Sequence, residues 1–205
     1  MSLRVAAVSF LNAWPLVCPL TGQHLPGARK PVDLQDSPHD SPMTEPMSVV
    51  PKTATDLSPV RMLEAELLAM PPVAALGLRI VEATSDRLRL HAPLAPNIND
   101  KGCAFGGSLG SLMTLAGWGL IVLRLAEAGL EADVFVADSE TRYRAPLFAD
   151  LEATAELAEG ESWEGFLSTL RSRGRARLSV RAVVGLPEGG VATESLSRYA
   201  AKLKG

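Results

Sequence analysis

The stretch that decides the fold reads NINDKGCAFGGS at residues 97–108 and LGSLMTLAGWGLIVLRLAEA at residues 109–128. Its first part is polar, carries three glycines and has no regular period, so it predicts a loop. Its second part contains only two charged residues and leaves almost no polar face. A helix that is apolar on every side is buried on every side. We therefore predict a long central helix that Ser108 caps at its start and Gly129 follows at its end.

A membrane span is the alternative to this central helix, since about 20 apolar residues would cross a bilayer. Arg124 inside the run, three glycines and the amphipathic segments that follow all argue against a span. Gly110 and Gly117 lie two helical turns apart and would let a strand approach the helix closely. We therefore expect a buried helix and no association with a membrane.

The segments around the helix predict an α+β fold with a mostly antiparallel sheet. Ser58 and Pro59 can start a helix that ends before Pro71. Two short strands are predicted at 78–82 and 87–92, and about four more follow Gly129, where the hydrophobic period changes to two. Strands that follow a helix as a group are typical of this class. The segment 162–170 fits either a short helix or the turn of a hairpin.

The first strand after the helix predicts two distinct faces. One face is expected to hold Phe135, Ala137, Ser139, Thr141 and Tyr143. The other is expected to hold Asp138, Glu140, Arg142 and Arg144, because side chains alternate along a strand.

Length and composition set the broad class. The 205 residues allow one domain with a real core, and we place it at 57–205. Residues 1–56 are predicted to be a disordered or mis-assigned extension, because the sequence from Thr21 to Pro59 is rich in Pro, Ser, Asp and Thr. The formal charge of −3 shows no balance typical of nucleic-acid binding. The two cysteines support neither a disulfide framework nor a zinc site, so a reducing cytoplasm is expected.

Two short patterns could indicate a catalytic nucleophile, but neither has the histidine that would activate it. Residues 106–110 match G-x-S-x-G, but that motif needs a preceding strand and a histidine downstream, and all three histidines lie upstream. Cys103 has no histidine nearby in the sequence to raise its thiolate fraction, so it reads as a small packed residue. No motif for a metal, a nucleotide or a nucleic acid is present.

A dense basic run lies near the C-terminus. It consists of arginines 171, 173, 175, 177 and 181, which Arg142 and Arg144 would extend. Such a run is commonly a solvated strand face. The functional alternative is a landing site for coenzyme A phosphates or for an acidic carrier protein.

The glycines before the helix have a clearer chemical meaning. Gly106 and Gly107 let a ligand approach the backbone with no Cβ in the way. Their amides and that of Ser108 lie at the positive end of the helix dipole, where an oxyanion binds well. Asn99 or Asn97 can add a neutral donor. A tight turn that only starts the helix is the structural alternative.

These residues resemble the YiiD C-terminal domain family, a branch of the hotdog-fold thioesterases. The resemblance runs from Leu57 to the C-terminus and rests on PNINDKGCAFGGSL (96–109), Ala116-Gly117-Trp118, Val136-Ala137-Asp138-Ser139 and Arg142-Tyr143. It implies a hotdog fold, in which an antiparallel sheet wraps a long central helix. It also implies a homodimer or homotetramer with active sites at a dimer interface, and acyl-CoA or acyl carrier protein as the partner that carries the substrate.

Related thioesterases of the phenylacetate type carry an Asn, a Gly, a His-Gly-Gly and a helix carboxylate. In this chain Asn99 and Gly102 stand at the positions of that Asn and Gly. Phe105 stands where those enzymes have the His, and Thr114 stands where they have the carboxylate. A general base typically adds about 10²–10⁴-fold to hydrolysis. Decarboxylation of a malonyl thioester needs only an oxygen site for the enolate, and donors there contribute roughly 10²–10³-fold each.

Three interpretations therefore stay open. The first, which the absent histidine and carboxylate favour, is a malonyl decarboxylase with Asn99, Gly106 and Gly107 as catalytic groups. The second is a thioesterase in which Asp100, Asp138 or Thr114 positions water. The third is a non-catalytic module that binds acyl thioesters. The residues expected to contact substrate are Asn97, Asp100, Phe105, Ser108, Thr114, Asp138 and Arg142, with no cofactor or metal beyond the thioester's own carrier group.

Overall fold

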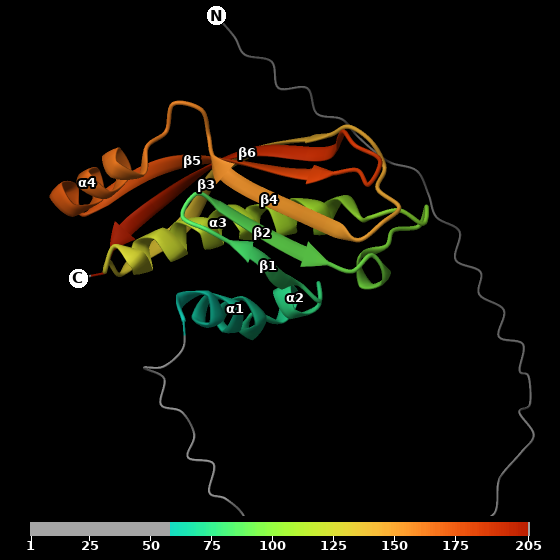
Figure 1. Cartoon of the computed structure of the whole chain (residues 1–205), viewed down its shortest axis with the longest axis horizontal. Coiled ribbons are helices and arrows are strands. Elements are labelled where there is room, and N and C mark those ends of the chain that lie inside the picture. The colour runs from blue at the N-terminus through green and yellow to red at the C-terminus, as the bar shows by residue number, and fades with distance from the viewer. Residues whose placement is uncertain (1–57, 205) are drawn as a thin grey trace, which may run out of the picture. The chain divides into compact units, whose positions relative to one another are not determined.

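The computed structural model describes residues 58–204, so the predicted extension at 1–56 lies outside the described residues (Figure 1). The helices are α1 (Pro59–Ala69), α2 (Pro71–Ala74), α3 (Gly106–Glu127) and α4 (Trp163–Arg173), with a short 3₁₀ turn η2 (Ala95–Asn97). The strands are β1 (Arg79–Ala83), β2 (Arg87–Ala92), β3 (Ala132–Tyr143), β4 (Leu151–Leu157), β5 (Arg175–Gly185) and β6 (Val191–Leu203).

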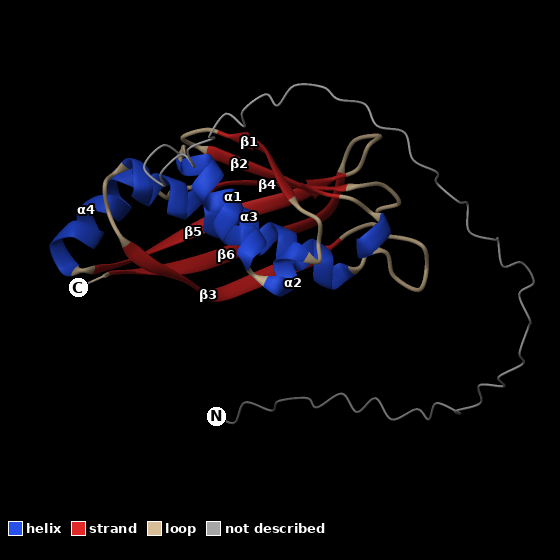
Figure 2. Cartoon of the chain, turned by 90° about the horizontal axis from the view of Figure 1, so that it is seen from below, coloured by secondary structure: helices blue, strands red, loops and turns tan. Residues whose placement is uncertain are grey.

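The strands form one antiparallel sheet of six strands in the order β1-β2-β4-β5-β6-β3. The long helix α3 lies along one face of this sheet, and α1 lies beside it (Figure 2). Leu63 of α1 lies next to Gly119 of α3, and Glu64 accepts a hydrogen bond from the Ile80 amide of β1 at 3.3 Å. The predicted α+β fold with a central helix and an antiparallel sheet is confirmed.

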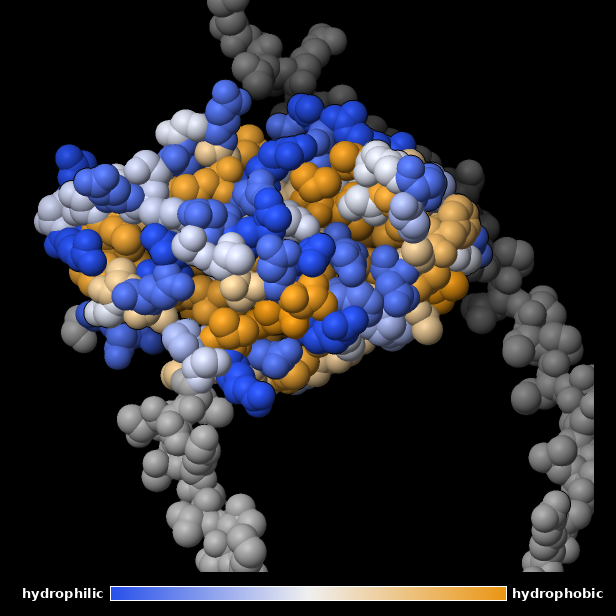
Figure 3. Space-filling view, in the orientation of Figure 1, coloured by the Kyte–Doolittle hydropathy of each residue, from blue (hydrophilic) through white to orange (hydrophobic). Residues whose placement is uncertain are grey.

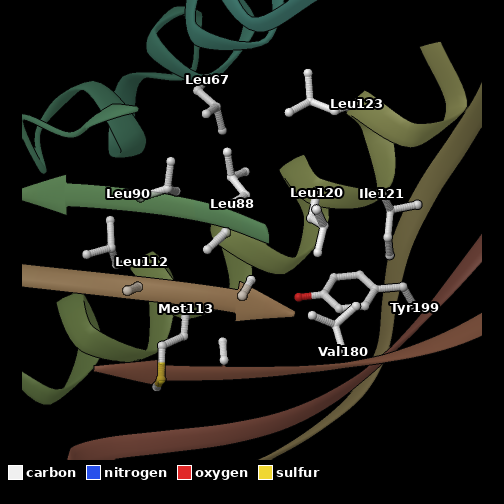
Figure 4. Packing of buried hydrophobic residues seen from close by; sticks show 14 of the residues in the cluster. Leu67, Leu88, Leu90, Leu112, Met113, Leu120, Ile121, Leu123, Val180 and Tyr199 are labelled. Carbon is white, nitrogen blue, oxygen red and sulfur yellow. The ribbon is translucent and has the colours of Figure 1, made fainter. Parts of the chain in front are cut away.

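The hydrophobic core lies between α3 and the inner face of the sheet. Alternate residues of β5 are buried, from Ala176 to Val184, while Arg175, Arg177 and Arg181 are exposed, as the pattern predicts. Figure 4 shows Tyr199 and Val180 among side chains of α3 and β2. Helix α3 is long and apolar enough to cross a membrane, but 56% of its most apolar window is buried inside this fold. The central-helix interpretation therefore holds.

Gly110 and Gly117 of α3 both face aromatic side chains from the sheet, and the predicted close approach is found at Gly117. A Cβ at Gly117 would lie 2.4 Å from the hydroxyl oxygen of Tyr199, which comes from β6. A Cβ at Gly110 would lie 3.5 Å from the hydroxyl oxygen of Tyr143, which comes from β3. The first approach requires glycine, whereas the second is an ordinary van der Waals distance.

The predicted start of α3 is wrong by three residues. The helix begins at Gly106 and its N-cap is Phe105, which makes no side-chain capping bond. Ser108 is the third residue of the helix and is buried, so it does not cap. The reason is that Gly106 and Gly107 adopt helical geometry, so the helix starts at Gly106.

The predicted faces of β3 are correct only beyond residue 137. The register with β6 shifts between Val136 and Asp138, which marks a bulge at Ala137. Ser139 therefore shares the inner face with Thr141 and Tyr143, while Phe135 lies on the outer face. Strand alternation alone could not reveal the extra residue.

The ambiguous segment at 162–170 is helical and belongs to α4. The Ser162 hydroxyl accepts a hydrogen bond from the Gly165 amide at 3.3 Å, as an N-cap does. Gly174 ends the helix with a φ of 68°. That left-handed conformation favours glycine and turns the chain directly into β5.

Candidate active site

The N-terminus of α3 presents unpaired backbone donors. Gly106, Gly107 and Ser108 are its first three residues, and the amide of Leu109 is the first to bond back, to the Phe105 carbonyl at 3.1 Å. The amides of the first turn have no acceptor within the helix and lie at the positive end of its dipole. This is the place where the sequence predicts an oxyanion site.

A cavity of about 330 Å³ opens beside this helix end. It is lined by Asn99, Ala104, Gly106, Leu109, Tyr143, Arg144, Ala145, Pro146 and Leu147. The structure thus brings Asn99 and Gly106 to one cavity, as predicted. No histidine and no carboxylate is among the lining residues.

Asn99 organises the loop before the helix. Its Oδ1 accepts hydrogen bonds from the amides of Lys101 at 2.8 Å and Cys103 at 3.2 Å. Its Nδ2 lies 3.2 Å from the Sγ of Cys103, which is a weak acceptor. The side-chain amide carries two hydrogens, so one of them stays available to a bound ligand.

Tyr143 is a site residue that the sequence analysis did not select. Its hydroxyl donates to the Gly106 carbonyl at 3.0 Å, and a Cβ at Gly106 would lie 3.3 Å from its ring. It ends β3 and places a phenol at the mouth of the cavity. The alternation of the strand predicted its face, but only the tertiary structure shows that this strand end meets the start of α3.

Asn97 does not contact the cavity, which corrects its prediction as a substrate-binding residue. Its side chain is 2% exposed, and its Nδ2 donates to the carbonyls of Leu76 at 2.9 Å and Pro93 at 2.8 Å. Both amide hydrogens are committed to the backbone. Asn97 therefore holds the loop in place.

Asp138 and Arg142 lie on the outer face of the sheet and do not line this cavity, so their contact with substrate stays a prediction. Asp138 accepts a hydrogen bond from the Nε of Arg198 at 2.9 Å. Arg142 is paired with Glu140 at 2.7 Å. They alternate with the inner residues Ser139, Thr141 and Tyr143, so the strand's pleat directs them to the opposite face.

The remaining predicted residues surround the site without lining the cavity. Asp100 is exposed and bonded to the Nζ of Lys101 at 2.9 Å, and this bond holds the pKa of its carboxyl below the ordinary value. Thr114 lies two turns into α3, where its carbonyl accepts a bond from Tyr199. Phe105 is 55% exposed, and its ring covers Gly107 so closely that a Cβ there would lie 2.3 Å away.

The described part of the chain offers no other catalytic constellation at this place. Its single histidine, His91, lies on β2 with its Nε2 3.2 Å from the Oδ2 of Asp150, and it does not line the cavity. Residues 58–204 also hold no group of three or more His, Cys, Asp or Glu side chains suited to a metal ion. The chemistry available here is that of hydrogen-bond donors around an oxygen, namely the helix amides, Asn99 and the Glu194-paired Arg144.

The six-stranded sheet around α3 and the donor-lined cavity define a hotdog-fold protein of the thioesterase superfamily. A family model described as "putative thioesterase (yiiD_Cterm)" matches residues 61–202. The chain belongs to this family, as the resemblance implied.

Solved structures agree with this assignment. A protein of unknown function from Chlorobaculum tepidum TLS is 28% identical, with a TM-score of 0.66 over 71% of this chain and 94% of that one. A protein described as a putative thioesterase from Shewanella oneidensis is 26% identical, with a TM-score of 0.63 over 70% of this chain and 97% of that one. A thioesterase from Haemophilus influenzae is 17% identical, with a TM-score of 0.55 over 70% and 90% of the two chains, and shows likeness of fold alone.

Proposed function

We propose that this protein hydrolyses acyl thioesters and holds the thioester carbonyl at the start of α3. The observation that carries the proposal is the cavity shared by Asn99 and Gly106, next to the free amides of the helix. Such donors stabilise the tetrahedral oxyanion and contribute roughly 10²–10³-fold each. The thioesterase family supports hydrolysis over the decarboxylation that the sequence favoured.

Hydrolysis also needs a group that positions water. Asp100 follows Asn99 in the loop and is ionised at neutral pH like any exposed aspartate, and its bond to Lys101 lowers its pKa further. We therefore assign the water-positioning role to Asp100 rather than to Asp138, which faces the other side of the sheet. In this scheme the leaving thiolate takes up the proton that the attacking water loses, so the products are the carboxylic acid and the free thiol.

Decarboxylation of a malonyl thioester is the second candidate, and one specific observation favours it. No carboxylate lines the cavity to repel a malonyl group, and no histidine lines it to act as a base. Breaking the C–C bond releases CO₂ and leaves an enolate, whose oxygen Asn99 and the helix amides would stabilise. A proton from solvent then completes the acetyl thioester.

The chain is also proposed to pair with a second copy through β3. This strand is at the edge of the sheet, is twelve residues long and is exposed along most of both faces. An unpaired edge of this length is a template for another strand. Phe135, Val136 and Tyr143 are exposed large apolar side chains on it and would be covered by such a pairing.

Mass spectrometry of acyl-CoA, acyl carrier protein and malonyl carrier protein after incubation tests the reaction. Free thiol from the acyl substrates is expected for hydrolysis, whereas acetyl carrier protein formed from malonyl carrier protein would establish the decarboxylase. Asn99→Asp keeps the acceptor for the Lys101 and Cys103 amides and removes the donor, so turnover should fall about 10²–10³-fold. Full turnover in this variant would refute the oxyanion assignment.

Asp100→Asn separates the two reactions. It should lower hydrolysis by about 10²-fold or more, since a positioned base is lost. It should leave decarboxylation unchanged, because that reaction uses no base. Binding without turnover by the unaltered protein would instead favour a non-catalytic module.

A further inference from the structure

One end of the molecule carries more positive charge than nearby carboxylates pair, because only Lys204 of its five cations has an ion-pair partner. Five cationic side chains gather there, namely Arg173, Arg175, Arg177, Lys202 and Lys204, around a groove of about 1220 Å³. We call this the basic groove. Its other lining residues are small, apolar or polar, including Phe135 and Thr169, and none is acidic. Figure 3 shows hydrophilic residues mixed with hydrophobic ones over the α4 end.

Most other arginines of the sheet are neutralised by ion pairs. Arg87, Arg89, Arg142, Arg144, Arg181 and Arg198 each pair with a carboxylate. Arg171 also lies at this end and has no ion pair. Elsewhere in residues 58–204, only Arg61 and Arg79 among the arginines and lysines lack an ion pair. The positive charge is thus concentrated in one place on a chain whose formal charge is −3.

The strand register places these charges side by side. On the outer face Arg175 of β5 lies opposite Lys202 of β6, and Arg177 lies opposite Ala200. Phe135 of β3 lies on the other side of Ala200. The Nζ of Lys204 lies 3.9 Å from the Oδ1 of Asp133. Arg142 and Arg144, which the sequence joined to this basic run, are ion-paired at the other end of β3 and do not belong to it.

We propose that the basic groove docks an acidic carrier protein that delivers the thioester, an inference that rests on the proposed function. Complementary charge across an interface gives specificity and speeds association. The groove is larger than the roughly 300–1,000 Å³ typical of small-ligand pockets and is open. Its cations are spread over α4, β5 and the C-terminal end of β6, which suits an acidic protein surface better than the phosphates of coenzyme A.

The position of the groove indicates which active site it serves. The Nη2 of Arg171 lies 3.5 Å from the Ala128 carbonyl, so this end adjoins the C-terminus of α3. The cavity lies at the N-terminus of that 22-residue helix, about 33 Å away at 1.5 Å per residue. In an antiparallel pair of β3 strands, Ala132 of one copy lies beside Tyr143 of the other. A carrier on one protomer therefore feeds the cavity of its partner.

Binding of a holo acyl carrier protein tests the surface without any turnover. Arg175→Glu/Arg177→Glu should weaken binding by roughly tenfold to hundredfold, because reversed charges repel an acidic partner. The matched control is Arg61→Glu/Arg79→Glu, which makes the same charge change on α1 and β1 and should change affinity by less than about twofold. Thermal melting of both variants confirms that they are folded, and Lys202→Glu provides a second single change in the groove.

Equal affinities for the groove variant and the control would overturn the proposal. So would a groove variant that loses affinity for coenzyme A and keeps it for the carrier. Binding by the unaltered protein with no turnover of any thioester would remove the proposed function and leave the docking surface standing. Turnover of small synthetic thioesters with no carrier binding would remove the docking surface and leave the proposed function standing.

Mixing two inactive variants tests delivery between protomers. A pair made of one Asn99→Asp chain and one Arg175→Glu/Arg177→Glu chain holds one intact groove opposite one intact cavity. Carrier-dependent turnover of the mixture should exceed that of either variant alone. Turnover no higher than the two variants measured separately would contradict delivery to the partner.

Discussion

Gly117 is the residue whose identity the packing constrains most clearly. A Cβ there would lie 2.4 Å from the Oη and 2.9 Å from the Cζ of Tyr199. Tyr199 is 1% exposed and cannot swing away into solvent. The glycine therefore serves the close approach of β6 to α3, at the cost of about 1 kcal/mol of helix propensity.

Gly117→Ala should lower the free energy of unfolding by roughly 1–3 kcal/mol, because overpacking forces the ring or the helix to shift. Urea denaturation measures this. Gly110→Ala is the control, since its Cβ meets only the Tyr143 hydroxyl at 3.5 Å and the helix gains up to about 1 kcal/mol from alanine. Equal stability of the two variants would show that the ring moves freely.

At the scale of elements, one buried phenol joins β6 to the middle of α3. The Tyr199 hydroxyl donates to the Thr114 carbonyl at 2.9 Å, and burial raises the pKa of this phenol to about 12. The ordinary pKa of tyrosine is 10.0, so the folded state binds the proton more tightly than the unfolded state. Its contribution to stability is complete below the unfolded pKa and is lost as the pH rises toward the folded value.

Tyr199→Phe should therefore reduce the loss of stability at high pH. Between pH 10 and 12 the unaltered protein should lose about 2 kcal/mol more than the variant, since each pKa unit corresponds to about 1.4 kcal/mol. At neutral pH the variant should already be about 1 kcal/mol less stable, because the bond to Thr114 is gone. Denaturation midpoints of both proteins measured across this pH range test the prediction. If the two midpoints fell in parallel with rising pH, Tyr199 would not be the group with the raised pKa.

At the scale of the whole molecule, the edge strand β3 carries the proposed pairing of two copies. The cavity lies where β3 ends, and the basic groove lies where β3 begins, so a second copy would bring the two functions together. Ala137 is exposed and sits at the bulge near the centre of β3. In an antiparallel pair about that centre, the two copies of Ala137 come close to one another.

Ala137→Lys should break the pair, because two ammonium groups would meet at the centre of the interface and lysine protects sheet edges. Sedimentation should show a dimer for the unaltered protein and a monomer for the variant at the same concentration. Arg79→Lys on the opposite edge strand, β1, serves as the control and should stay dimeric. A dimer that survives Ala137→Lys would place the interface elsewhere.

Much of the architecture follows from local patterns. The apolar run after residue 108 predicts a buried helix, because no polar face is left to meet water. The alternation from Ala176 to Val184 predicts the inner face of β5 for a similarly local reason. The loop with Asn99 and the glycine pair predicts the cavity, since these residues are adjacent to the helix in sequence.

Long-range geometry decided the rest. Asn97 and Asn99 look equivalent in the sequence, but two distant carbonyls occupy the amide of the first and leave the second beside the cavity. The bulge at Ala137 and the contact of Tyr143 with Gly106 depend on how β3 pairs with β6 and crosses α3. The sequence by itself determined the elements and their buried faces, because local periodicity encodes them. Only the tertiary structure decided which side chains share a site, because hydrogen-bond partners and register join residues far apart along the chain.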